Sequence, residues 1–147
     1  MPEAIDSGSR GVEMLLDSNL ESVDQAEAAV LRLANTVGFD EDDLHRISVA
    51  VRESMVNAVV HGNRYNANKK VHLSVSAEAG KLTIRVADEG DGFDASKLPD
   101  PLDEKNLLRQ SGRGILLMQA FVDELEIRPR AGHGTEVRMV KRLPGHP

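Results

Sequence analysis

The sequence predicts an α/β domain in which helices cover one face of a mostly antiparallel mixed sheet. Three observations lead to this fold class. Apolar and polar residues alternate with period two in several short segments, as in half-buried strands, and apolar residues recur at helical spacing in others. These segments follow in the order strand, two helices, hairpin, long loop, helix and hairpin. We expect residues 1–147 to form a single domain with its own core.

The N-terminal part is predicted to run from a short strand into two helices. Residues 12–16 form the apolar strand, and Ser18 followed three residues later by Glu21 has the capping-box pattern that opens a helix. Gly38 suits the position just after this helix, and Asp40 suits the N-cap of the next one. The second helix carries an apolar stripe formed by Leu44, Ile47, Val51, Met55 and Ala58.

Two pairs of alternating segments predict the remaining strands. Residues 71–75 and 82–86 alternate in polarity on either side of Gly80, which predicts a tight hairpin. Residues 124–128 and 135–140 form the closing pair around a glycine-bearing turn. Connections this short join antiparallel strands.

The segment between the two hairpins has a different character. Residues 93–111 lack periodicity, contain prolines and are long for a structureless connection, so we expect them to form a functional lid or a mobile loop. A helix is predicted to follow over residues 112–121. The polar residues 1–10 are expected to be disordered.

Composition excludes several classes of function. Cysteine is absent, so neither a disulfide framework nor a thiolate metal site is available. A net charge of −6 argues against broad binding to nucleic acid or anionic membranes, and an aromatic content of 3% argues against base-stacking platforms. No apolar run approaches the roughly 20 residues of a membrane span, and residues 1–10 do not resemble a signal peptide. A cytoplasmic location is therefore expected.

A carboxylate and a carboxamide lie one helical turn apart in the second helix. Glu53 and Asn57 share a face because they are four residues apart. Mg²⁺ prefers oxygen ligands and often takes few from the protein, so the amide oxygen of Asn57 is a candidate ligand. Glu53 could then act as a general base toward a hydroxyl or water. A solvated polar stripe is the alternative, but the flanking valines 49, 56 and 60 favour a buried, functional pair.

Two glycine-rich segments later in the chain predict the rest of a nucleotide site. Asp88 ends a strand and could accept a hydrogen bond from the exocyclic amine of a base, while Gly90 and Gly92 let the ring approach the backbone. An ordinary turn is the alternative. Residues 90–95 also match the dinucleotide fingerprint, but the prolines that follow would break its helix and Asp88 would repel a pyrophosphate, so we reject that match.

The second glycine segment, Gly112, Arg113 and Gly114, opens a predicted helix after the lid. Backbone N–H groups at such a position bind phosphate, and the guanidinium of Arg113 could reach a terminal phosphate. A simple N-cap is the alternative. Thr135 could either cap a turn or contact ligand. The phosphate loop of the common nucleotide-binding proteins is absent from the chain.

Residues 53–62, 88–93 and 111–118, in this order, resemble the N-box and the two glycine boxes of the ATP-binding superfamily that includes gyrase B, a heat-shock chaperone, histidine kinases and MutL. The resemblance spans nearly the whole chain. Within the superfamily, this short single-domain form resembles the bacterial anti-sigma-factor serine kinases.

The resemblance implies a two-layer α/β sandwich of the Bergerat type, with ATP and Mg²⁺ bound between the helices and the lid. It implies that Glu53 is the base, that Asn57 binds magnesium and that Asp88 binds the amino group of adenine. The other implied ATP-binding residues are Gly90, Gly92, Gly112, Arg113, Gly114 and Thr135. Some members carry an arginine directly before the second glycine box to assist transfer; here Gln110 fills that position, which leaves Arg109 or Arg113 for the role.

The resemblance also implies partners. Members of this subfamily typically form homodimers, sequester a sigma factor and phosphorylate a serine on an anti-anti-sigma (STAS-type) partner. The chain is therefore expected to be an ATP-dependent protein serine kinase with anti-sigma activity. The alternative is a non-enzymatic switch in which ATP orders the lid and only that conformation engages a partner.

Overall fold

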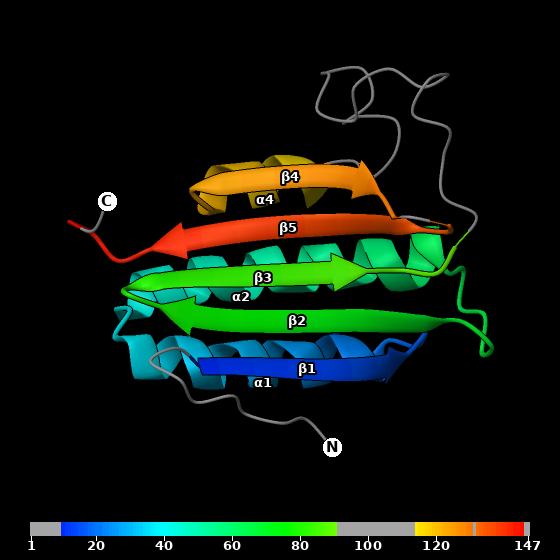
Figure 1. The fold of residues 1–147 in the computed structure, drawn as a ribbon, viewed down its shortest axis with the longest axis horizontal. Helices are drawn as coiled ribbons and strands as arrows, with labels where there is room; N and C mark the ends of the chain where they lie inside the picture. Colours follow the sequence, from blue (N-terminus) through cyan, green and yellow to red (C-terminus); the bar gives the residue numbers. More distant parts are fainter. Residues whose placement is uncertain (1–9, 91–113, 131, 146–147) are drawn as a thin grey trace.

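A computed structural model describes residues 10–90, 114–130 and 132–145. Within them, five strands form one sheet in the order β1-β2-β3-β5-β4, and each neighbouring pair is antiparallel. The α-helices lie together on one face of this sheet (Figure 1). The strands are β1 (Arg10–Asp17), β2 (Lys70–Glu78), β3 (Lys81–Ala87), β4 (Glu124–Pro129) and β5 (Thr135–Arg142). The predicted two-layer α/β fold is confirmed, and its described strands contain no parallel pair.

The first helix, α1 (Glu21–Val37), begins differently from the prediction. The N-cap residue is Leu20, whose side chain makes no cap hydrogen bond, and the amide of Ser22 is instead met by Oδ1 of Asn19 at 3.0 Å. Ser18 turns away and donates its hydroxyl to the carbonyl of Lys69. The predicted capping box is therefore wrong, because a distant carbonyl, on the residue before β2, accepts the serine hydroxyl that a local cap would use.

The end of α1 and the start of α2 (Glu41–Val56) follow local rules. Gly38 takes a left-handed conformation at φ +106° and donates its N–H to the carbonyl of Ala34, as predicted for a helix-ending glycine. Asp40 caps α2, because its Oδ1 accepts the N–H of Asp43 at 2.8 Å. Both predictions are confirmed.

The second helix changes type before it ends. After Val56 the chain continues as a π-helix, η1 (Asn57–Gly62), and the N–H of Asn63 donates to the carbonyl of Ala58, five residues back. The sequence predicted one α-helix through this region. Short π segments inside helices occur often at functional sites, because the wider turn re-aims the side chains that follow.

The core lies between the helices and one face of the sheet. Along β2, Val71, Leu73 and Val75 are buried, whereas His72 and Ser74 point to the other face. The short helix α4 (Gly114–Phe121) packs against α2 and buries Met118. The sheet thus has one apolar face beneath the helices and one polar face without helices (Figure 1).

Candidate functional site

Asp88 lies at the point where β3 ends and β5 begins. It is buried, with 6% of its surface exposed, and its Oδ1 accepts the N–H groups of Gly90 at 3.0 Å and Thr135 at 3.1 Å. The N–H of Asp88 in turn donates to the carbonyl of Thr135 at 3.0 Å. Asp88 and Thr135, which the sequence predicted as parts of one site, are therefore brought together by reciprocal bonds between neighbouring strands.

Three glycines close around Asp88. A β-carbon added to Gly62 would stand well inside 3.0 Å of Oδ2 of Asp88, and one added to Gly90 would collide with the carbonyl of Gly62. Gly134, at φ +92°, approaches the carbonyl of Asp88 in the same way. The carboxylate thus sits where the end of the π-helix meets the end of β3, and no larger residue fits at these three positions.

Burial raises the pKa of the Asp88 carboxyl group. Desolvation disfavours the charged form, and it outweighs the N–H bonds from Gly90 and Thr135 and the positive charge of Arg130, all of which act to lower the pKa. A desolvated carboxylate gains strongly from a further donor, because few water molecules compete for it. Asp88 is therefore suited to accept a hydrogen bond from a ligand amine.

Glu53 and Asn57 lie on the helical run that ends against Asp88. The N–H of Asn57 donates to the carbonyl of Glu53, so α-helical spacing holds between them and both side chains are half-buried. Their shared face is therefore confirmed by the backbone, while their roles stay predictions. The described residues contain no cluster of three or more histidine, aspartate or glutamate side chains suited to a metal ion.

The other predicted site residues divide into two groups. Gly114 is the buried first residue of α4, and Thr135 is the first residue of β5. Gly92, Gly112 and Arg113 lie outside the described residues, as do Arg109, Gln110 and the predicted lid at 93–111. Their placement in the site stays a prediction.

Asn63 is a buried residue directly after η1, and the sequence did not predict it as part of a site. Its amide nitrogen donates to Oγ of Ser18 at 2.8 Å and to the carbonyl of Lys70 at 2.9 Å, and its Oδ1 accepts the N–H of Glu89 at 2.7 Å. One side chain thus joins the β1–α1 connection, the start of β2 and the residue after Asp88. No local pattern points to it, because its partners lie up to 45 residues away.

Glu89 and Arg130 are two further residues near Asp88 that the sequence did not predict as part of the site. The carboxylate of Glu89 accepts the N–H of Lys70 at 2.9 Å and lies 2.6 Å from Nε2 of His72. These two contacts, led by the Lys70 bond, hold the pKa of Glu89 below its usual range. Nη1 of Arg130 donates to the carbonyl of Asp88 at 3.0 Å. On the polar face of the sheet, Arg130 therefore contacts the backbone of Asp88, and His72 contacts the side chain of Glu89.

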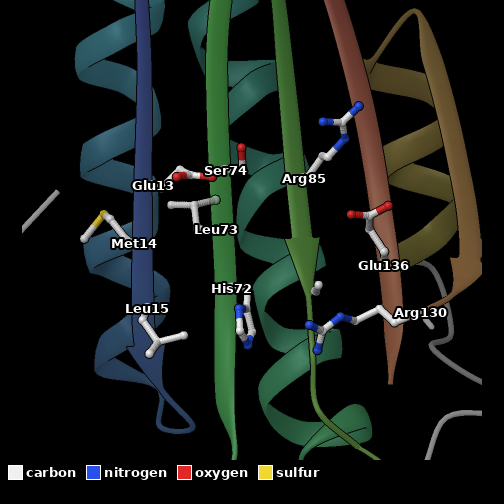
Figure 2. A pocket seen from close by; sticks show the side chains of 10 residues that line it. Glu13, Met14, Leu15, His72, Leu73, Ser74, Arg85, Arg130 and Glu136 are labelled. Carbon is white, nitrogen blue, oxygen red and sulfur yellow. The ribbon is translucent and has the colours of Figure 1, made fainter. Parts of the chain in front are cut away.

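A groove of about 700 Å³ lies on this polar face, opposite the helices (Figure 2). The helices that carry Glu53 and Asn57 lie on the other face of the sheet. Arg130 and His72, which contact Asp88 and Glu89, nevertheless line this groove. Its lining is formed by Glu13, Met14, Leu15, His72, Leu73, Ser74, Arg85, Ala87, Arg130 and Glu136.

No helix among the described residues is both long enough and apolar enough to cross a bilayer.

Comparison with known proteins gives a family and two kinds of relative. The model of the histidine kinase-like ATPase domain matches residues 16–141. An anti-sigma F factor of Bacillus cereus is 33% identical over 135 residues, which cover 89% of this chain and 92% of the relative. A serine-protein kinase RsbW of Oceanobacillus iheyensis is 28% identical over 127 residues, which cover 82% of this chain and 80% of the relative.

The fold is also found in a solved structure. A chain from Mycobacterium tuberculosis that contains RsbU and RsbW domains aligns with a TM-score of 0.65 and 20% sequence identity. The alignment covers 90% of the present chain and 32% of that longer one. At this identity the likeness supports the fold alone.

Proposed function

The chain belongs to the histidine kinase-like ATPase domain family, and on this premise we propose that it is an ATP-dependent anti-sigma factor and protein serine kinase. Relatives about one-third identical over most of the chain carry the anti-sigma name, and a more distant one carries the serine-kinase name. The observation that supports the proposal most directly is the buried Asp88 carboxylate, enclosed by glycines at the end of the helix that bears Glu53 and Asn57.

The adenine end of the site is assigned to Asp88 and its neighbours. Oδ1 is held by Gly90 and Thr135, so Oδ2 is the oxygen we assign to the 6-amino group of adenine. The absent side chains of Gly62, Gly90 and Gly134 leave the space that lets the backbone segments converge there. Gly92 is assigned to the same end of the site from the sequence.

The phosphate end is assigned to Glu53, Asn57 and the 112–114 segment. The Glu53 carboxylate takes the proton of a partner serine hydroxyl, the serine oxygen forms a bond to the γ-phosphorus, and the bond to the β–γ bridging oxygen breaks as ADP leaves. The amide oxygen of Asn57 is a ligand suited to Mg²⁺, whose charge would offset that of the phosphates. Gly112, Arg113 and Gly114 are assigned to the phosphates, and Arg113 is the cation proposed to assist transfer.

The proposed partners are a sigma factor, which the chain sequesters, and an anti-anti-sigma (STAS-type) protein, which it phosphorylates. The cytoplasm, where ATP and sigma factors are both found, is the proposed location. A homodimer is proposed on the family resemblance. Leu15 on the edge strand β1, with 62% of its surface accessible, and Leu20 at the start of α1, with 53%, are exposed apolar side chains that suit such a contact.

The experiment that tests the proposal is incubation of the purified chain with γ-labelled ATP and a panel of serine-bearing STAS domains. Wild type should label one of them on serine. Glu53→Gln should bind ATP with unchanged affinity and lose transfer by a factor of at least about 100, because a general base typically accelerates a reaction by that much or more. Glu41→Gln, a carboxylate change on the exposed first turn of the same helix, should leave transfer unchanged. Phosphate transfer at the normal rate by Glu53→Gln would overturn the assignment of Glu53 as the general base.

A non-enzymatic switch is the second candidate, and Gln110 favours it, because some members of the family that the chain resembles place a transfer-assisting arginine at that position. A switch needs bound nucleotide and no turnover. A non-hydrolysable ATP analogue should then support partner binding as well as ATP does over many hours. A kinase would instead release its STAS partner in phosphorylated form with ATP and retain it with the analogue.

A further inference from the structure

Arg130 reaches the Asp88 backbone from the face of the sheet that carries no helices. It follows the last residue of β4, and its own N–H donates to the carbonyl of Gly134 at 2.9 Å, which fixes its position at the turn. Its side chain points from there across the start of β5 toward the end of β3 (Figure 2). Nη1 meets the carbonyl of Asp88 at 3.0 Å.

The peptide bond between Asp88 and Glu89 is held at both of its polar atoms by side chains. Arg130 donates to its carbonyl, and Oδ1 of Asn63 accepts its N–H at 2.7 Å. Because a peptide unit is planar, holding both polar atoms fixes the orientation of the backbone that follows the Cα of Asp88, from which its side chain projects. Asn63 is 2% exposed and holds this peptide from within the protein, whereas Arg130 borders the outer groove.

We propose that Arg130 is a positioning residue for base recognition: it orients the Asp88 peptide so that the carboxylate meets the amino group of adenine. This inference rests on the proposed ATP site. Arg130 itself touches no nucleotide, since it lies on the opposite face of the sheet from the helices. Its effect is therefore confined to the part of the affinity that depends on the amino group.

The test compares ATP with purine riboside triphosphate, which lacks the 6-amino group and keeps every phosphate. Dissociation constants for both are measured by calorimetry on wild type, Arg130→Met and Arg130→Lys. Wild type should prefer ATP by roughly tenfold or more, the range for one hydrogen bond to a charged group. Arg130→Met should lose most of this preference by weakening ATP alone, and Arg130→Lys, which keeps a donor and the charge, should recover part of it.

The matched control is Arg128→Met, two residues earlier in the same hairpin. Arg128 contacts Glu126 and Glu136 and makes no contact with Asp88, so the preference should stay at the wild-type value. Should Arg130→Met fail to fold, Arg130→Gln, whose amide is two atoms shorter, gives the same comparison. Equal weakening of both nucleotides, or an unchanged preference, would overturn the positioning role. A wild-type chain that binds ATP without preferring it would instead refute the assignment of Asp88 to the amino group.

Discussion

Gly62 and Asp88 are in direct contact although they belong to different layers of the fold. A β-carbon on Gly62 would stand well inside 3.0 Å of both Oδ2 and the carboxyl carbon of Asp88. The final residue of the π-helix must therefore lack a side chain if the carboxylate is to keep its place. The contact connects the helix that carries Glu53 and Asn57 to Asp88, the residue assigned to adenine.

Gly62→Ala should weaken ATP binding by at least about tenfold, because the displaced carboxylate loses a charge-assisted hydrogen bond worth about 1.5–3 kcal/mol. Calorimetric titration with ATP measures this. Gly11→Ala is the control, since a β-carbon there meets its nearest atom at an ordinary 3.6 Å. If Gly62→Ala bound ATP with wild-type affinity, the Asp88 carboxylate would not be the hydrogen-bond acceptor for the amino group of adenine.

Asn63→Ala should lower the free energy of unfolding by about 2–3 kcal/mol, because it leaves buried groups of three chain segments without their partner. Urea denaturation followed by circular dichroism gives the value. Asn66→Ala removes an exposed amide in the same turn and should change stability by no more than about 0.5 kcal/mol. If Asn63→Ala also changed the free energy of unfolding by no more than about 0.5 kcal/mol, water would be replacing the hydrogen bonds of Asn63 at no cost.

Asp88→Asn should abolish ATP recognition and yet increase stability at neutral pH. The folded-state pKa of Asp88 is raised by burial, so its stabilising contribution is complete below the unfolded pKa and is lost as pH rises through the folded one. At pH 7 the buried charge is a cost that asparagine removes. The advantage of the variant over wild type should shrink as pH falls toward 3.8, the ordinary aspartate value. Paired urea denaturation at several pH values measures it, and an advantage that grows on acidification would contradict the sign.

Ala79→Asn should stabilise the β2–β3 hairpin. Ala79 and Gly80 form the turn at φ +50° and +77°, and the left-handed conformation that costs alanine about 1 kcal/mol is tolerated by asparagine. The expected gain is about 0.5–1 kcal/mol, or a few degrees in Tm. Differential scanning calorimetry detects such a shift. Ala79→Val, which is β-branched, should move Tm in the opposite direction.

Local sequence signals predicted much of this fold. Features that depend on contacts between residues far apart in the sequence could not be predicted. Gly38 and Asp40 were identified because the bonds that end α1 and begin α2 lie within four residues of them. Ser18 misled for the opposite reason: its hydroxyl goes to Lys69, 51 residues away. The π-helix at 57–62 has no composition that distinguishes it from an α-helix.

The candidate site divides along the same line. Asp88 and Thr135 could be predicted because their segments resemble known motifs, and the structure brings them together. Asn63, Glu89 and Arg130 could not, because each acts on the backbone of a strand end that is identified only once β2, β3 and β5 are in register. Residue type gave no indication, since asparagine in a turn and arginine after a strand are common.

The reciprocal bonds between Asp88 and Thr135 span 47 residues of sequence. A nascent chain on the ribosome therefore cannot complete the proposed adenine pocket until β5 has emerged and docked beside β3. At that proposed site nucleotide would bind only the finished molecule, and by mass action it would stabilise the whole sheet against unfolding. At the proposed site, ATP would thus be a stabilising ligand of the folded chain as well as its phosphate donor.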